Sequence, residues 1–119
     1  MATLGHGPPL QRTAHWLSYV EHDARNPVWT HRLEALSRAH TYIRYDQRGC
    51  GLSDWSPPSM SFESWIDDVG AVVEANGLKR FASFGMSQGG TIAISYAAHH
   101  PETISCLVMP ATRRCCWRW

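Results

Sequence analysis

One stretch constrains the fold of this chain more than any other, because residues 81–96 read as a strand, a tight turn and a helix with no linker between them. The run F-A-S-F is mostly apolar and predicts a buried strand, and the following segment T-I-A-I-S-Y predicts a helix. Between them stands G-M-S-Q-G, with Ser87 at its centre. Glycines two residues to either side let neighbouring backbone pass close to a residue in a strained conformation. We therefore expect Ser87 at the apex of the turn.

The G-x-S-x-G pattern between a strand and a helix is typical of a nucleophile elbow. Such a turn lifts the serine hydroxyl clear of the sheet and points the first amides of the helix at a group bound above it. Ser87 is therefore the candidate nucleophile. The other residues of the turn are expected to support its geometry: Gly85, Met86, Gly89 and Gly90. The alternative interpretation is a glycine-rich turn with a buried structural serine.

Composition limits the other classes of function. The 119 residues allow one domain, and 44% apolar and 18% charged residues are typical of a globular protein. A formal charge of +1 gives no electrostatic reason to expect a nucleic-acid partner. No run approaches the roughly 20 apolar residues that span a membrane, and the N-terminus lacks a signal-peptide pattern, so we expect no membrane partner and a cytoplasmic location. The four cysteines and seven histidines show no ligand spacing, so we expect free thiols, no metal and no cofactor.

Strands and helices alternate along the chain, which predicts a parallel sheet with right-handed crossovers. The first strand is a poor one, because Gln11 and Arg12 interrupt the apolar pattern of a central parallel strand. Residues 15–27 are expected to form a loop, and Asn26 and Ser61 to cap the helices that follow them. The expected strands are residues 10–14, 41–45, 81–84 and 104–109, and the expected helices are residues 27–39, 62–75 and 88–100.

The elbow and this order of elements resemble the α/β-hydrolase superfamily. The segment D-x-R-G-x-G-x-S at residues 46–53 is similar to the family's loop after a strand, and H-x-P-E at residues 99–102 to the end of its post-elbow helix. The likeness covers about residues 5–109 and only the N-terminal half of the family's usual fold. The fold class is therefore expected to be α/β, a partial α/β-hydrolase fold with about four parallel strands and flanking helices. Residues 44–54 look most like hydrolase-like domains linked to bacterial regulators and cyclases.

The resemblance implies a serine hydrolase that acts on a small molecule with an ester, amide or similar acyl bond. Ser87 would attack the carbonyl, and the backbone amides of Gln88 and Trp16 would stabilise the oxyanion. Ala14-His15 stands where the family has His-Gly or Pro-Gly, and for Trp16 the alternative is a partly buried packing tryptophan. His15, whose loop would face the elbow, is also a candidate substitute base. The pocket loops are expected to be structural, through His15, Asp46, Arg48, Gly49 and Gly51.

The family orders its catalytic triad as serine, acid and histidine. After Ser87 this sequence contains no aspartate, one glutamate (Glu102) and the histidines His99 and His100. These histidines would lie about 15–18 Å from the start of their helix at 1.5 Å per residue. We therefore expect residues 1–110 to form a truncated hydrolase domain with impaired or no activity, and residues 111–119 to be an atypical Arg/Cys/Trp tail. A non-catalytic sensor or binding domain attached to regulatory proteins is the alternative, and a remnant without function is a third.

A sheet of only four strands would leave two of them uncovered. The strands at 41–45 and 104–109 would be the edges, and bare edges favour pairing with another chain. The sequence therefore predicts self-association through exposed sheet edges.

Overall fold

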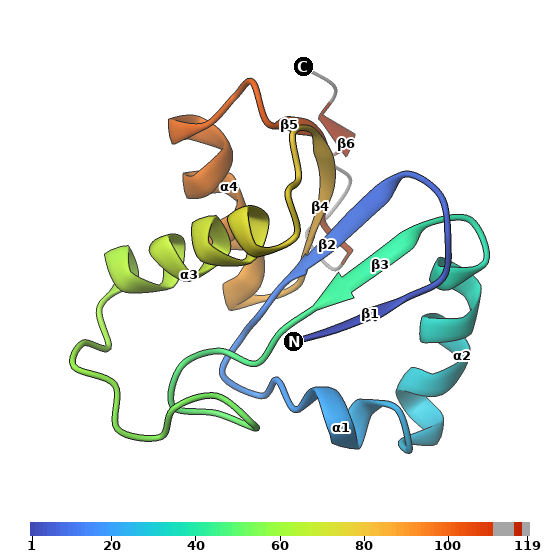
Figure 1. Ribbon diagram of the computed structural model, residues 1–119, viewed down its shortest axis with the longest axis horizontal. Coiled ribbons are helices and arrows are strands. Elements are labelled where there is room, and N and C mark those ends of the chain that lie inside the picture. Colours follow the sequence, from blue (N-terminus) through green and yellow to red (C-terminus); the bar gives the residue numbers. More distant parts are fainter. Residues whose placement is uncertain (111–115, 118–119) are drawn as a thin grey trace.

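The computed structural model describes residues 1–110 and 116–117, and these form a sheet flanked by helices on both faces (Figure 1). Most of the expected tail, residues 111–115 and 118–119, lies outside the described residues. The helices are α1 (Val20–Asp23), α2 (Pro27–Ser37), α3 (Phe62–Ala75) and α4 (Gln88–His99). The strands are β1 (Ala2–Leu4), β2 (Pro9–Thr13), β3 (Thr41–Arg44), β4 (Phe81–Gly85), β5 (Ile104–Val108) and β6 (Cys116–Trp117).

The described strands form one sheet in the order β1-β3-β2-β4-β5-β6. Its four central strands, β3, β2, β4 and β5, run parallel, which confirms the expected α/β class and the four-stranded parallel core. Strand order reverses between β2 and β4. Open α/β sheets bind ligands at such a point, beyond the carboxyl ends of the strands.

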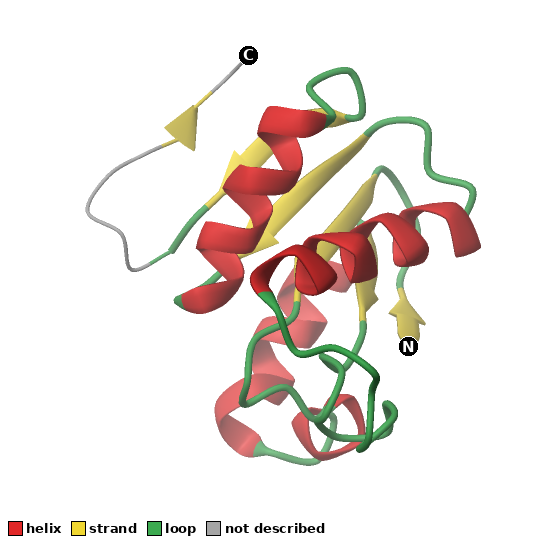
Figure 2. Cartoon of the chain, turned by 90° about the vertical axis from the view of Figure 1, so that its left-hand side faces the viewer, coloured by secondary structure: helices red, strands yellow, loops and turns green. Residues whose placement is uncertain are grey.

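Two apolar cores lie on opposite faces of the sheet. Helices α3 and α4 cover one face, crossing in front of the strands in Figure 2, and pack on the larger core around Val69, Phe81 and Ile92. Helix α2 covers the other face, where Leu33 packs against Leu10 and Tyr42. No described helix combines the length and apolar character that crossing a bilayer requires.

Both expected helix caps are confirmed. The Asn26 side chain accepts a hydrogen bond from the Val28 amide, with Pro27 in the first helical turn, and the Ser61 side chain accepts one from Ser64. These contacts satisfy amides that have no partner inside the helix, which is why α2 and α3 begin where the sequence predicts.

Two expectations about the periphery are wrong, the bare edge strands and the unbroken loop at 15–27. The strands at 41–45 and 104–109 are not edges, because β1 pairs antiparallel with β3 and β6 pairs antiparallel with β5. The segment 15–27 is not entirely a loop, since it contains α1. The predicted self-association rested on those two bare edges, and it stays a prediction.

The two polar residues that interrupt β2 are buried inside the sheet. Arg12 is 4% exposed, and its Nη1 lies 2.9 Å from Asp23 Oδ2 in α1. Arg44 of β3 lies 3.8 Å from the same carboxylate, and the Arg12 guanidinium stacks on Trp29 at 4.6 Å from the ring centroid. Gln11 is fully buried, and its amide group makes no hydrogen bond within the described part of the chain. Helix α1 therefore supplies the counter-charge that lets a cationic residue occupy a central strand.

Candidate active site

Ser87 lies at the junction of β4 and α4 with a strained backbone. Its φ of 54° and ψ of −127° make it the one non-glycine residue of the described chain with positive φ. Such conformations cost of order 1–3 kcal/mol and persist where the surrounding structure imposes them. The side chain is exposed and makes no capping hydrogen bond to α4. The hydroxyl is therefore available to a molecule bound at the carboxyl ends of the strands.

Close backbone packing explains the two glycines of the motif. A Cβ atom on Gly85 would lie 2.6 Å from Gly90 Cα and 2.8 Å from the Gly89 carbonyl oxygen. A Cβ atom on Gly89 would lie 2.7 Å from the Thr13 carbonyl oxygen at the end of β2. Real Cβ atoms essentially never approach other atoms this closely, so no other residue fits without movement of the backbone. The elbow is thus packed directly against the strand that leads into the Trp16 loop.

The two candidate oxyanion amides lie on neighbouring segments. The Gln88 amide is in the first turn of α4, where backbone N–H groups have no partner inside the helix. The Trp16 amide points toward the elbow and donates a hydrogen bond of 3.1 Å to Oε1 of the Gln88 side chain. The Trp16 side chain is 62% exposed, so it does not pack in the core. Ser87, Gln88 and Trp16 are therefore brought together by the elbow and the loop after β2.

His15 is turned toward the buried arginine cluster. Its Nε2 lies 2.9 Å from Arg12 Nη2, and its Nδ1 accepts from the Leu17 amide at 3.2 Å. Both neighbours are donors, so neither nitrogen faces an acceptor that would stabilise the imidazolium. Burial, followed by the Arg12 charge, lowers the pKa of His15 below its usual value of 6.5, although Asp23 acts in the opposite sense. A neutral imidazole accepts at one nitrogen only, and here a donor from Arg12 or Leu17 lies against either nitrogen, so His15 is poorly placed to take a proton from Ser87.

The lowered pKa of His15 predicts a loss of stability in acid. His15 in the unfolded chain takes up a proton near pH 6.5, whereas His15 in the folded chain does so only at lower pH. The free energy of unfolding therefore falls as the pH drops through 6.5. One proton limits the slope to about 1.4 kcal/mol per pH unit. Urea unfolding between pH 5.5 and 7.5 should show a flatter profile for His15→Gln than for the wild type. The exposed His31→Gln control should keep the wild-type slope, and equal slopes in all three proteins would contradict this account.

The loop after β3 is held by buried and bidentate contacts. The Asp46 carboxylate accepts from the amides of Val20 at 2.7 Å and Leu52 at 3.0 Å. Arg48 forms a two-point ion pair with Asp68 of α3, with N···O distances of 2.8 and 2.6 Å. Gly49 and Gly51 both have positive φ in this loop. These residues shape the loop and make no contact with Ser87.

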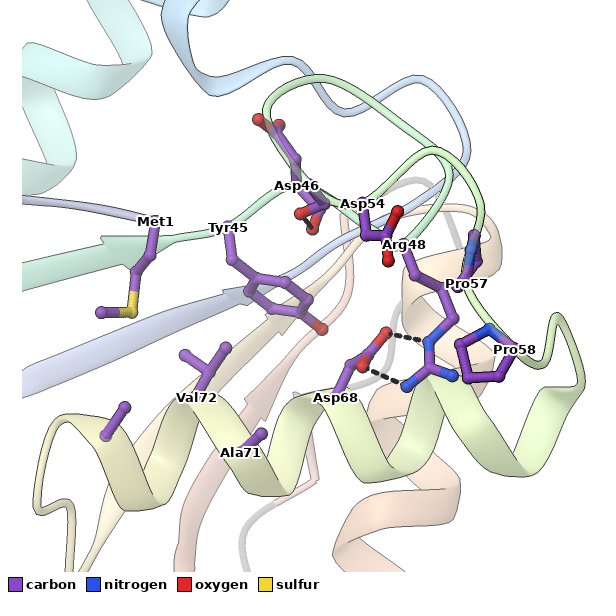
Figure 3. Close-up of a pocket in the computed structure, with 12 residues that line it drawn as sticks. Met1, Tyr45, Asp46, Arg48, Asp54, Pro57, Pro58, Asp68, Ala71 and Val72 are labelled. Carbon is purple, nitrogen blue, oxygen red and sulfur yellow. Dashed lines mark hydrogen bonds and ion pairs between the residues drawn. The ribbon is translucent and has the colours of Figure 1, made fainter.

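A pocket of about 440 Å³ lies between this loop and α3 (Figure 3). Tyr45, Asp54 and the Arg48–Asp68 pair line it, and Ser87 does not. Every carboxylate in its lining already accepts hydrogen bonds from the protein: Asp46, Asp54 and Asp68.

The histidines and the glutamate after Ser87 lie at the far end of α4. The His99 ring contacts the Ser95 carbonyl oxygen, and the His100 ring stacks on Tyr96 and lies 3.8 Å from Glu102. Within residues 1–110 and 116–117, no histidine or carboxylate forms a hydrogen bond with the Ser87 side chain, and no group of three metal-ligating side chains gathers. Among the described residues, the site thus brings the candidate nucleophile Ser87 close to the two candidate oxyanion amides, those of Gln88 and Trp16.

Two residues near the site had no signal in the sequence analysis. The Cys50 thiol donates to the Trp16 carbonyl oxygen at 3.2 Å, and Asp68 is the partner of Arg48. Cys50 fills a variable position of the D-x-R-G-x-G-x-S pattern, and Asp68 lies on the polar side of an amphipathic helix. Both contacts become visible only when the loop at 46–54 is seen packed against the Trp16 loop and against α3.

Comparisons with known proteins agree with this geometry. The family model described as alpha/beta hydrolase fold matches residues 22–115. Proline iminopeptidase of Lactobacillus helveticus is 38% identical over 74 residues, which cover 59% of this chain and 25% of that protein. A hydrolase structure from Pseudomonas aeruginosa PA01 superposes with a TM-score of 0.78 and 27% identity, covering 91% of this chain and 39% of that one. The N-acyl homoserine lactone degrading enzyme Est816 gives a TM-score of 0.76 and 25% identity, with the same coverage of 91% and 39%.

The chain thus spans well under half the length of these relatives. The residues that the family model matches, 22–115, include the elbow. The strand order, the strained Ser87 and the matched family model all agree. The chain belongs to the α/β-hydrolase family.

Proposed function

We propose that this protein is a serine hydrolase in which Ser87 attacks an ester, amide or similar acyl bond of a small molecule. One observation carries the proposal: Ser87 is exposed and strained at the end of β4, and the Trp16 amide donates to the side chain of the next residue, Gln88. A strained, exposed serine has no evident structural benefit, because it makes no cap to α4. Its cost is accounted for if the hydroxyl reacts.

The reaction has two steps that share one oxyanion site. The Ser87 oxygen bonds to the carbonyl carbon, the alcohol or amine leaves with the hydroxyl proton, and an acyl-Ser87 ester remains. Water then attacks this ester, releases the carboxylic acid and restores the hydroxyl. In each step negative charge develops on the carbonyl oxygen, where the amides of Gln88 and Trp16 would donate to it.

Proton transfer limits the rate that we expect from this chain. His15 is engaged by Arg12 and the Leu17 amide, and His99 and His100 lie at the opposite end of α4. A positioned general base contributes about 10²- to 10⁴-fold to such reactions. Residues 1–110 should therefore react with strong acyl-type electrophiles while turning over ordinary esters slowly.

A fluorophosphonate probe tests the proposal because it needs the nucleophile and the oxyanion site but no second step. The Ser87 oxygen bonds to phosphorus, fluoride leaves, and the proton passes to the buffer. We expect mass spectrometry of tryptic peptides to show labelling at Ser87 well before any other serine. Ser87→Gly should abolish that label, and it should fold at least as stably as the wild type because glycine tolerates positive φ.

Two results would contradict the proposal. Labelling of Ser87 no faster than of the exposed serines would favour the non-catalytic sensor or binding domain. Unchanged total labelling in Ser87→Gly would place the reactive group elsewhere.

A further inference from the structure

The Gln88 side chain is hydrogen-bonded to the Trp16 amide, which the proposed reaction needs as an oxyanion donor. Its Oε1 accepts the Trp16 N–H at 3.1 Å, and the substrate's carbonyl oxygen would need this same donor when it becomes an oxyanion. One N–H cannot serve both oxygens at full strength. We propose that Gln88 is a placeholder, whose side-chain carbonyl holds the Trp16 amide in the resting protein and leaves when the substrate's carbonyl oxygen arrives. This inference rests on the proposed function of Ser87.

The position of Gln88 at the surface keeps the free-energy cost of this exchange small. The contact lies at the surface, so its side chain can rotate into solvent without opening the core. A neutral hydrogen bond contributes modestly to stability, because water replaces the partner that is lost. The backbone of Gln88 does not move in this exchange, because the elbow and the first turn of α4 hold it. One residue thus supplies a fixed oxyanion amide and an exchangeable side chain.

Cys50 still holds the peptide that follows the Trp16 Cα when Gln88 has left, and so restrains Trp16 on the side away from its N–H. The Cys50 thiol, in the loop after β3, donates to the Trp16 carbonyl oxygen at 3.2 Å. Burial, and then the nearby Asp46 charge, raise the pKa of Cys50, so the sulfur keeps the proton that it donates. In the same turn the Ser18 amide donates to the His15 carbonyl oxygen at 2.8 Å, and this bond holds the peptide group that carries the Trp16 N–H. Cys50 is therefore a positioning residue for the Trp16 amide.

The decisive variant is Gln88→Met, which keeps the length of the side chain and removes the carbonyl oxygen. We expect the second-order rate of Ser87 labelling by the fluorophosphonate to rise about two- to tenfold, the worth of one neutral hydrogen bond. In ¹⁵N–¹H spectra the Trp16 amide resonance should shift as it loses its acceptor. Ile94→Met, at an exposed position of the same helix, is the matched control and should change neither value.

Cys50 is tested by a pair of variants. Cys50→Ala removes the donor and should slow Ser87 labelling, whereas Cys50→Ser keeps a hydroxyl donor and should restore the rate. A residue that only filled space would not distinguish serine from alanine in this way.

The outcomes separate this inference from the proposed function. A Gln88→Met rate equal to or below the wild-type rate, with Ser87 still labelled, would overturn the placeholder and leave the nucleophile standing. An unshifted Trp16 amide resonance would overturn the contact itself. Loss of selective Ser87 labelling in the wild type would remove the proposed function and this inference together.

Discussion

Gly85→Ala is expected to lower the free energy of unfolding by about 3 kcal/mol or more, at the upper end of what overpacking costs. The added Cβ would lie 2.6 Å from Gly90 Cα, 2.8 Å from the Gly89 carbonyl oxygen and 2.9 Å from the Gly90 nitrogen. All three atoms belong to the backbone of the first turn of α4, which is packed against β4 and cannot rotate away. A domain with only about 5–15 kcal/mol of stability would lose a large share of it.

Gly70→Ala is the matched control for that prediction. Gly70 lies inside α3, and a Cβ there would meet only the Tyr96 ring at an ordinary 3.8 Å. Alanine in a helix interior should raise the stability by about 0.5–1 kcal/mol. Urea unfolding followed by tryptophan fluorescence measures both variants. Equal effects of the two substitutions would show that steric contact at the elbow does not determine the identity of residue 85.

Asp23→Asn is expected to destabilise the protein by about 3–5 kcal/mol, since it removes the charge that two buried guanidinium groups share. The Asp23 carboxylate lies 2.9 Å from Arg12 and 3.8 Å from Arg44, with the arginine side chains only 5% and 3% exposed. Asparagine has the same shape and keeps an acceptor oxygen, so the change isolates the charge. Arg12 and Arg44 would remain buried without this counter-ion.

Glu21→Gln in the same short helix tests an exposed pair. Glu21 and Arg25 lie 3.9 Å apart with side chains 49% and 82% exposed, so we expect an effect of about 0.5 kcal/mol or less. In thermal or urea unfolding, Asp23→Asn should have a much lower free energy of unfolding than Glu21→Gln. A loss under about 1 kcal/mol for Asp23→Asn would mean that the arginines remain solvated or find another anion.

The elbow glycines and the Arg12–Asp23 pair both help to position the proposed site. The elbow glycines bring α4 against the carbonyl oxygen of Thr13, at the end of β2. The Arg12–Asp23 pair anchors β2 to α1, and the chain between them is the loop that carries Trp16. The separation between Ser87 and the Trp16 amide is thus set by packing on one side and by a buried ion pair on the other.

Local patterns in the sequence predicted the elements with strong local causes. The F-A-S-F strand, the G-M-S-Q-G turn and the caps at Asn26 and Ser61 each depend on residues close together in the chain. β1 was missed because three residues carry too little pattern, and its strand conformation comes from pairing with β3. α1 was missed because four residues cannot form a stable helix alone, and Asp23 is held there by Arg12.

The candidate site shows the same difference between features set by local sequence and features set by tertiary packing. Sequence alone determined the family, the parallel core and the position of Ser87, because a strained serine between a strand and a helix requires glycines at fixed offsets. Only the tertiary structure decided what surrounds it. It turned His15 toward Arg12, placed the Gln88 side chain on the Trp16 amide and brought the Cys50 thiol to the Trp16 carbonyl oxygen. The contacts of Trp16 with Gln88 and with Cys50 join residues 72 and 34 positions apart, so they depend on how distant segments pack and not on local spacing.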